Sequence, residues 1–310
     1  MSVINVDNST LTPVTECTTQ VALKALGWRG VDTGEALDIG SVVHDALEGY
    51  FLGHDLEWCF DHAWDEYFPS ERLVDKPQYQ YNNVRDIFME YCRSHPIAHL
   101  PFEILETERM VGMPLDDAGE IMFWMKRDAK VLDKVTGSIV PLDHKTTSWS
   151  IGASWQAKWR TVSQLSGYIW ATQKETGEPC PFAYVNAIQI NKLPDSNKKC
   201  YKHQMKYSEC RLMHTEFALL TYERAEHQLK QWRKDAITLA RRYQSIREGF
   251  SDLDIIKHAD CFGTFNRSCD WCEFNKYCRM GKEPKYAEAL LTQGRWAPWL
   301  DKGAITFDWR

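Results

Sequence analysis

The sequence predicts an α/β protein with a mixed central β-sheet flanked by helices. Apolar residues at helical spacing dominate residues 15–100, strand-like apolar segments follow within 101–192, and a long charged segment of helical character covers 210–248. Helices on both sides of mostly antiparallel strands are typical of a layered α/β domain. The chain has 310 residues, 44% of them hydrophobic, which is enough for one sizeable core.

We expect a single domain over residues 1–310. Its expected parts are N-terminal helices over 15–100, the sheet and one helix over 101–192, a further helical part over 193–259, and a cysteine-rich segment over 260–280.

The N-terminal part predicts three helices. Residues 15–30 indicate a short helix ended by glycine, 36–53 a longer helix, and 82–95 a third that the following proline ends. In the second helix His44 and Glu48 are four residues apart and share a face. The apolar residues of that helix recur at Val42, Val43, Ala46, Leu47 and Tyr50.

The sheet part predicts three strands in succession, over residues 102–115, 120–133 and 138–147. A turn with Gly137 makes a hairpin of the last two. A helix over 161–177 and a fourth strand over 181–192 follow. Residues 193–204 indicate an exposed loop or hairpin tip.

Composition narrows the possible functions. The formal net charge is −6, so nucleic-acid binding has to rest on local patches. Thirteen Trp provide rings that can stack on unpaired bases. The N-terminus lacks the basic start and apolar run of a signal peptide, and no stretch of about 18 apolar residues exists. We therefore expect a cytoplasmic protein without a membrane partner, whose clustered cysteines bind metal rather than form disulfides.

The stretch "LDHKTTSWS" carries Asp143 and Lys145 on one face of a strand, because side chains at i and i+2 point the same way. By itself this is either a surface ion pair or half of a metal-dependent active site. The hairpin brings Asp128 next to Asp143, and Mg²⁺ prefers such carboxylate oxygens. The carbonyl of His144 is a candidate further ligand. Lys145 could stabilise the charge of a reacting phosphate or help to deprotonate water.

These residues resemble a known family. "RDAKV", a hairpin and "PLDHKTTS" are similar to the paired motif of the PD-(D/E)XK nucleases, and most of all to the RecB-type branch, which includes CRISPR-associated and bacteriophage exonucleases. "GSVVHDALE" resembles the branch's G-x-x-x-H-x-x-L-E helix, which implies His44 as a metal ligand. "QLSGYIWA" resembles its Q-x-x-x-Y helix, which implies Gln164 and Tyr168 near the substrate. "LETERMVGMPL" stands where the family carries a glutamate, with Glu108 preferred and Glu106 the alternative.

The resemblance covers residues 15–280, with "KRDAKV" in place of the usual G-x-I-D. It implies a deoxyribonuclease with Mg²⁺ or Mn²⁺, most simply an exonuclease that processes DNA ends and favours single strands. It further implies a bacteriophage or bacterial origin, action in the host cytoplasm if phage-encoded, and a recombination or helicase partner. The alternatives are a non-catalytic nucleic-acid-binding module and a redox-sensing iron–sulfur protein on the same fold. The implied metal-site residues are His44, Glu108, Asp128, Asp143 and His144, with Lys145 catalytic.

The C-terminal cysteines indicate a second metal site. Cys269, Cys272 and Cys278 form C-x2-C-x5-C, and Cys261 precedes them. This spacing alone leaves Zn²⁺ and an iron–sulfur cluster open. The resemblance implies a structural [4Fe–4S] cluster with Cys17 as the fourth ligand, Cys261 as the alternate and Zn²⁺ as the alternative metal. We expect the remaining cysteines to be packing or surface thiols: Cys59, Cys92, Cys180, Cys200 and Cys210.

Overall fold

The fold is taken from a computed structural model of the chain. The structure describes residues 3–31, 34–69, 74–191, 198–200, 202–260, 269–270, 272–294, 297–301 and 303–310. The chain divides into two compact units, each built from separate segments. Unit 1 comprises Met1–Thr33, Met110–Lys126 and Ala225–Arg310, and unit 2 comprises Gly34–Arg109 and Arg127–Arg224.

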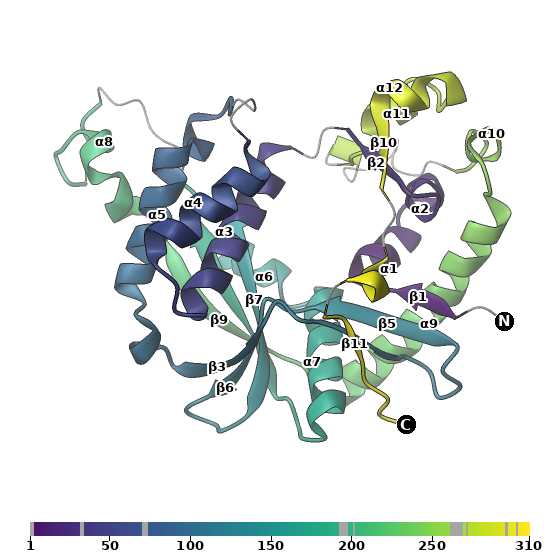
Figure 1. The fold of residues 1–310 in the computed structure, drawn as a ribbon, viewed down its shortest axis with the longest axis horizontal. Helices are drawn as coiled ribbons and strands as arrows, with labels where there is room; N and C mark the ends of the chain where they lie inside the picture. The colour runs from purple at the N-terminus through teal and green to yellow at the C-terminus, as the bar shows by residue number, and fades with distance from the viewer. Residues whose placement is uncertain are drawn as a thin grey trace. The chain divides into compact units, whose positions relative to one another are not determined.

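Unit 2 is built around a five-stranded sheet in the order β3-β6-β7-β8-β9 (Figure 1). The β7–β8 pair is parallel and the other pairs are antiparallel, so the sheet is mixed, as the sequence predicts. Its strands are β3 Phe102–Thr107, β6 Ala129–Asp133, β7 Ile139–Thr147, β8 Phe182–Gln189 and β9 Phe217–Glu223. Its helices are α3 Glu35–Phe51, α4 Leu56–Tyr67, α5 Tyr81–Ser94, α6 Ala153–Lys158, α7 Ser163–Thr176 and α8 Tyr207–Cys210, with 3₁₀ turns η1 Pro77–Tyr79, η2 Ile97–His99 and η3 Arg211–His214.

The core of unit 2 lies around β7 and β8. Every residue of β8 is buried, as expected for a central strand that is covered on both faces. Helices α3 and α7 both pack against β7. Helix α3 approaches closely at Gly40, where an added Cβ would stand 3.4 Å from Thr146 Oγ1. The α3 contact therefore places His44, one turn further along, over the strand that carries Asp143 and Lys145.

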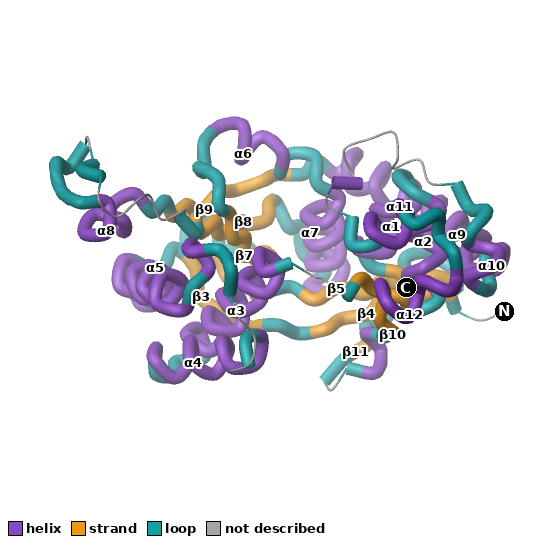
Figure 2. The backbone as a smooth tube through the Cα atoms, turned by 90° about the horizontal axis from the view of Figure 1, so that it is seen from above, coloured by secondary structure: helices purple, strands orange, loops and turns teal. Residues whose placement is uncertain are grey.

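Unit 1 combines a four-stranded sheet, in the order β1-β5-β4-β11, with a two-stranded β10–β2 ribbon. The long helix α9 packs against α1, α2 and β1 (Figure 2). The strands are β1 Ile4–Val6, β2 Trp28–Gly30, β4 Met110–Pro114, β5 Ile121–Lys126, β10 Leu291–Gln293 and β11 Ile305–Thr306. The helices are α1 Asn8–Val14, α2 Thr18–Ala25, α9 Glu226–Gly249, α10 Leu253–Ile256, α11 Asn275–Arg279 and α12 Ala287–Leu290, with 3₁₀ turns η6 Pro284–Tyr286 and η7 Pro298–Leu300.

The number of strands predicted over residues 102–133 is wrong. Each of the two expected strands is two strands: one breaks after Thr107 and the other between Lys126 and Ala129. The second half of the first expected strand is β4 and the first half of the second is β5, and these two pair in unit 1. The remaining halves, β3 and β6, pair in unit 2. A continuous apolar pattern conceals such a break, because both halves alternate with the same period.

The helical character expected over 193–259 also needs correction, because β9 occupies Phe217–Glu223 and α9 begins only at Glu226. Strand β9 pairs with β8 along its length, and this tertiary partner decides its conformation.

The predicted hairpin is confirmed: β6 and β7 are antiparallel neighbours, and Gly137 in their turn has the left-handed φ of +70° that favours glycine. The single domain over residues 1–310 stays a prediction. Within the described ranges, no helix is long and apolar enough to cross a membrane.

Candidate active site

Three predicted ligand residues meet in unit 2. His44 comes from α3, Glu108 from the turn after β3, and Asp128 from the residue before β6. One ligand atom of each lies within 4.8 Å of the others. The Nδ1 atom of His44 is 3.4 Å from the Oδ2 atom of Asp128. An imidazole and two carboxylates at this spacing can hold one divalent cation.

Glu108 reaches this group through an unusual backbone conformation. Its φ is +46°, in the left-handed region that residues with a side chain seldom adopt, and its N–H donates to the carbonyl of Asp128 at 3.1 Å. The hydrogen bond joins the break after β3 to the break before β6. Backbone strain of this kind persists where the surrounding structure fixes it, often at functional sites.

Glu106, the alternative glutamate, lies in a different cluster. Its carboxylate is 2.8 Å from Arg109, 3.4 Å from Arg127 and 3.5 Å from Lys130. The Arg127 side chain is only 2% exposed and also pairs with Glu175 at 2.7 Å. A buried guanidinium needs such negatively charged partners. Glu106 therefore belongs to a structural ion-pair network. Glu108 is therefore the glutamate that shares the site with His44 and Asp128.

Asp143 and Lys145 form a tight ion pair on β7. The Lys145 Nζ atom is 2.6 Å from Asp143 Oδ2, and Asp143 is 1% exposed. The strand register sets Leu142 opposite Ala129, so Asp143 and Asp128 are next to each other at one end of the hairpin. The Asp128 carboxylate also accepts a hydrogen bond from the His144 N–H, which ties it to β7.

The electrostatics of the two aspartates favour a bound cation. Burial, together with the Asp128 charge, raises the pKa of Asp143 to about 6, although the Lys145 charge opposes this. Burial also opposes ionisation of Asp128, but the nearby His44 outweighs it and holds the pKa of Asp128 well below its usual value. Two carboxylates that repel each other in a buried place are relieved by a positive ion between them. The donor set thus fits Mg²⁺ or Mn²⁺.

The His144 ring lies edge-on beside the His44 ring, with the two centroids 5.7 Å apart. Its Nδ1 lies 2.8 Å from Asn186 Nδ2, which therefore donates to it, and its centroid lies 5.4 Å from that of Phe51. Burial lowers the pKa of His144 to about 3, so the ring stays neutral. The sequence expectation for this residue concerned its backbone carbonyl. The Asn186 contact had no sequence signal, since it depends on the β7–β8 register.

Gln164 and Tyr168 lie together on α7, where the Gln164 amide donates to the Tyr168 hydroxyl at 2.9 Å. Burial and the charges of Asp143 and Asp128 raise the pKa of Tyr168 well above its ordinary value. The phenol therefore keeps its proton and remains a donor. Tyr168 is thus near enough to both aspartates to feel their charge. That the pair lies near the substrate stays a prediction.

Two tryptophans that follow β7 in the sequence, Trp149 and Trp159, were not singled out from the sequence. Trp159 follows α6, and Lys145 Nζ lies 5.6 Å from its ring centroid. Trp149, in the loop after β7, is 69% exposed. A sequence signal for Trp149 was present, because it stands four residues beyond Lys145 in "HKTTSWS".

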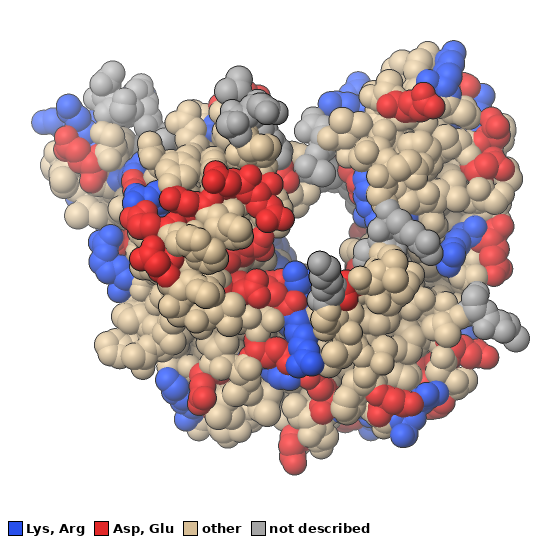
Figure 3. All heavy atoms as spheres, viewed as in Figure 1, with Lys and Arg blue, Asp and Glu red and all other residues tan. Residues whose placement is uncertain are grey.

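Charge is uneven on the surface of unit 2. On the face shown in Figure 3, Asp and Glu side chains gather over α3 and α4. The exposed acidic residues of α4 are Glu57, Asp61, Asp65 and Glu66. That surface repels a phosphate backbone.

The comparison with protein families decides the identity of the fold. A model of the "PD-(D/E)XK nuclease superfamily" matches residues 9–279, most of the chain. The chain belongs to this superfamily. It is therefore a nuclease, a phosphodiester hydrolase that acts on nucleic acid, and its superfamily uses divalent metals. The predicted α/β nuclease fold is confirmed.

One similar solved structure comes from Eubacterium rectale and is named "Putative exonuclease". It is 13% identical, the alignment covers 88% of each chain, and the TM-score is 0.51, which supports the fold. No curated protein matches the sequence.

The predicted cysteine ligands lie in unit 1. Cys17 is the N-cap of α2, Cys269 and Cys272 precede α11, and Cys278 lies in α11. Burial raises the pKa of the Cys272 thiol, and the nearby Cys17 and Cys269 raise it further. Cys17 and Cys269 thus lie near Cys272. Cys261 lies outside the described residues.

Contacts around these cysteines join the two ends of the sequence. The Thr19 N–H donates to the Asp260 carbonyl at 3.2 Å, and Lys24 pairs with Glu273 at 3.2 Å. Glu273 also accepts from the Gly30 N–H at 3.0 Å, where no Cβ would fit because it would stand 2.5 Å from the Glu273 carbonyl oxygen. Helix α2 and the cysteine-rich segment therefore pack closely together.

Proposed function

We propose that this nuclease is a RecB-type deoxyribonuclease that degrades DNA from its ends and favours single strands. The observation that carries the proposal is the meeting of His44, Glu108 and Asp128 beside the buried Asp143–Lys145 pair. The E. rectale protein named as an exonuclease supports end-directed cleavage. The exposed ring of Trp149 supports unpaired DNA, because such rings stack on unpaired bases.

The proposed metal ligands are His44, Glu108, Asp128, Asp143 and the backbone carbonyl of His144. When bound, Mg²⁺ or Mn²⁺ would neutralise phosphate charge and make water a better nucleophile at neutral pH. The His44 ring fits this role: burial disfavours its charged form, yet the Asp128 carboxylate outweighs burial and raises the pKa of His44. A divalent cation bound in place of this proton would be attracted by the same Asp128 carboxylate.

Lys145 is the proposed catalytic cation. Asp143 fixes its ammonium group at the end of β7, where it can stabilise the negative charge that develops on the reacting phosphate. Tyr168, which keeps its proton, and Gln164 are the proposed substrate-positioning donors. A preorganised donor at a developing charge accelerates the reaction without further rearrangement.

The four cysteines Cys17, Cys269, Cys272 and Cys278 are proposed to hold a structural [4Fe–4S] cluster, with Cys261 as the alternate ligand and Zn²⁺ as the alternative metal. The proximity of Cys17 to Cys272 supports a site that fastens α2 to α11. We further propose a cytoplasmic protein of a bacterium or bacteriophage that works with a recombination or helicase partner.

The function is tested with end-labelled DNA in Mg²⁺ or Mn²⁺. Linear single-stranded DNA is expected to shorten from an end, double-stranded ends more slowly, and covalently closed circles not at all. An Asp128→Asn protein prepared in parallel excludes a contaminating nuclease. Rapid nicking of closed circles by the parent but not by Asp128→Asn would show an endonuclease instead.

A further inference from the structure

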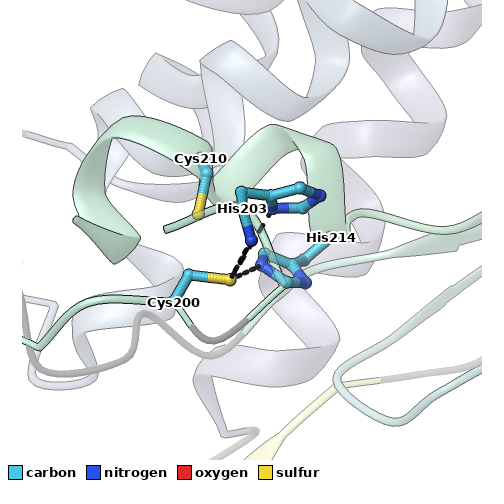
Figure 4. A group of neighbouring side chains, drawn as sticks. All are labelled: Cys200, His203, Cys210 and His214. Atoms are coloured by element: carbon cyan, nitrogen blue, oxygen red, sulfur yellow. Dashed lines mark hydrogen bonds between the residues drawn. The ribbon is translucent and has the colours of Figure 1, made fainter. Parts of the chain in front are cut away.

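A second group of metal-type side chains lies in unit 2, far along the sequence from the nuclease motifs. Cys200, His203, Cys210 and His214 point toward one another (Figure 4), and one ligand atom of each lies within 4.8 Å of all the others. The Cys200 Sγ atom is 3.1 Å from His214 Nε2 and 3.6 Å from His203 Nδ1. From the sequence, Cys200 and Cys210 are expected to be packing or surface thiols, and the two histidines carry no expectation.

Two local turns bring the four side chains together. Cys200 and His203 flank a tight turn in which the His203 N–H donates to the Cys200 sulfur at 3.4 Å and the Cys200 N–H donates to the Met205 carbonyl at 2.7 Å. Gln204 in this turn has a left-handed φ of +56°. Cys210 ends α8 and His214 ends η3, so they are four residues apart on consecutive helical turns and share a face.

The segment around this group has no hydrophobic core of its own. Among the residues that the structure describes between 198 and 216, Cys200 and Cys210 are the buried ones, each 0% exposed. The long apolar side chains Met205 and Met213 are 39% and 61% exposed. Burial of two thiols alone cannot offset the entropy of ordering such a segment, and small units of this kind depend on a metal or a disulfide.

We propose that Cys200, His203, Cys210 and His214 bind one Zn²⁺ ion in a tetrahedral Cys₂His₂ site. Ideal tetrahedral coordination sets neighbouring sulfur and nitrogen ligand atoms about 3.3–3.8 Å apart, close to the two distances given above. The backbone N–H that points at Cys200 favours the thiolate form that zinc binds. A Cys200–Cys210 disulfide would explain the thiols but not the two imidazoles, whose nitrogens face the Cys200 sulfur.

The site fastens the connection between β8 and β9. These strands are antiparallel neighbours that a loop of about two to five residues could join, but the chain runs from Gln189 to Phe217 between them. The far end of this connection is anchored to the body of unit 2, because Arg211 pairs with Asp86 on α5 and Asn191 donates to Thr215 Oγ1 at 2.7 Å. With both strand ends fixed, the zinc ion would hold Cys200 and His203 against α8 and η3 without touching the nuclease site.

The proposal is tested by metal analysis of the full-length protein. Cys200→Ser and Cys210→Ser are each expected to lower the zinc content by one equivalent per chain. Cys180→Ser, a matched change of a buried cysteine of unit 2 outside the group, is expected to leave zinc unchanged. Cys278→Ser separates this site from the cysteine-rich segment, because it should not affect this equivalent. Equal zinc content in the parent and both variants, or a Cys200–Cys210 disulfide found by peptide mapping, would overturn the proposal.

Two further measurements keep the test decisive if a serine variant folds poorly. His214→Cys offers zinc a thiolate in place of an imidazole and is expected to retain the ion, whereas His214→Phe should lose it. A packing role for the ring predicts the reverse order of stability. Chelation with EDTA should also speed tryptic cleavage at the exposed lysines of this segment at least several-fold, and added Zn²⁺ should reverse this. The lysines are Lys198, Lys199, Lys202 and Lys206.

Discussion

The Lys145 ammonium lies 2.6 Å from a carboxylate oxygen of Asp143, and the two side chains are buried to different degrees: the Asp143 side chain is 2% exposed and that of Lys145 is 20% exposed. The carboxylate is thus enclosed beside Asp128, while the ammonium has access to solvent. The tasks that we propose for these two paired residues differ, and mutation should separate them.

Removal of Asp143 and removal of Lys145 should have different effects. Asp143→Ala takes a charged ligand from the cation, so Mn²⁺ binding and cleavage should be lost together. Lys145→Ala should lower the single-turnover cleavage rate by about 10²–10³ because one preorganised charge is gone. It should leave Mn²⁺ affinity unchanged or slightly raised, since a nearby positive charge is removed. Calorimetric Mn²⁺ titration beside single-turnover kinetics measures both effects.

The exposed Lys234 on α9 provides the control, and Lys234→Ala should behave like the parent. A Lys145→Ala protein that cleaves at the parental rate would reduce the Asp143–Lys145 pair to a structural ion pair.

The two candidate glutamates should differ in the same way. Glu108→Gln weakens a ligand of the proposed cation, so the Mn²⁺ requirement for cleavage should rise by at least tenfold with little change in thermal stability. Glu106→Gln removes a charge from the network around the buried Arg127, so it should lower the melting temperature and leave the Mn²⁺ requirement nearly unchanged. Thermal melts and metal-dependence curves of both variants decide the assignment, and the reverse pattern would make Glu106 the ligand.

The exposed Trp149 ring should contribute to single-strand binding. Trp149→Ala is expected to weaken the binding of single-stranded DNA by about 1–3 kcal/mol, and Trp149→Phe by less, because a smaller ring still stacks. Trp58 on α4 is 51% exposed and stands among acidic residues, so Trp58→Ala serves as the matched control. Fluorescence anisotropy in Ca²⁺, with single- and double-stranded probes, measures the effect. Equal losses from both Trp variants would exclude a specific role for Trp149.

Local patterns predicted the centre of the site but not its surroundings. The turn at Gly137 sets the register of β6 and β7, so the neighbourhood of Asp128 and Asp143 follows from sequence. Glu108, with its left-handed backbone, lies within one continuous strand-like pattern of the sequence. The pattern gives no sign that the strand ends there, because the end results from β3 and β4 joining different sheets.

The missed features share a dependence on long-range contacts. Strand β9 pairs with β8 along its length, and the strand-favouring residues Phe217, Thr221 and Tyr222 alone did not decide between strand and helix. The Cys₂His₂ group was readable as C-x2-H and C-x3-H, but its significance depends on two turns that face each other. Spacing along one strand predicted the pairing of Asp143 with Lys145, whereas the Cys₂His₂ group, whose residues come from two separate turns, was missed.

The cysteine-rich segment leads to the last prediction. If Cys17, Cys269, Cys272 and Cys278 hold a [4Fe–4S] cluster, protein purified without oxygen should be brown and should contain iron and sulfide in equal amounts. Cys17→Ser should lose the colour, and the melting temperature should fall because α2 is no longer fastened to α11. Cys59→Ser, a buried thiol in unit 2, provides the matched control. Iron content and the visible spectrum of each variant give the result: a cluster that survives Cys17→Ser but not Cys261→Ser would place all four ligands in the C-terminal segment, and zinc without iron would exclude the cluster.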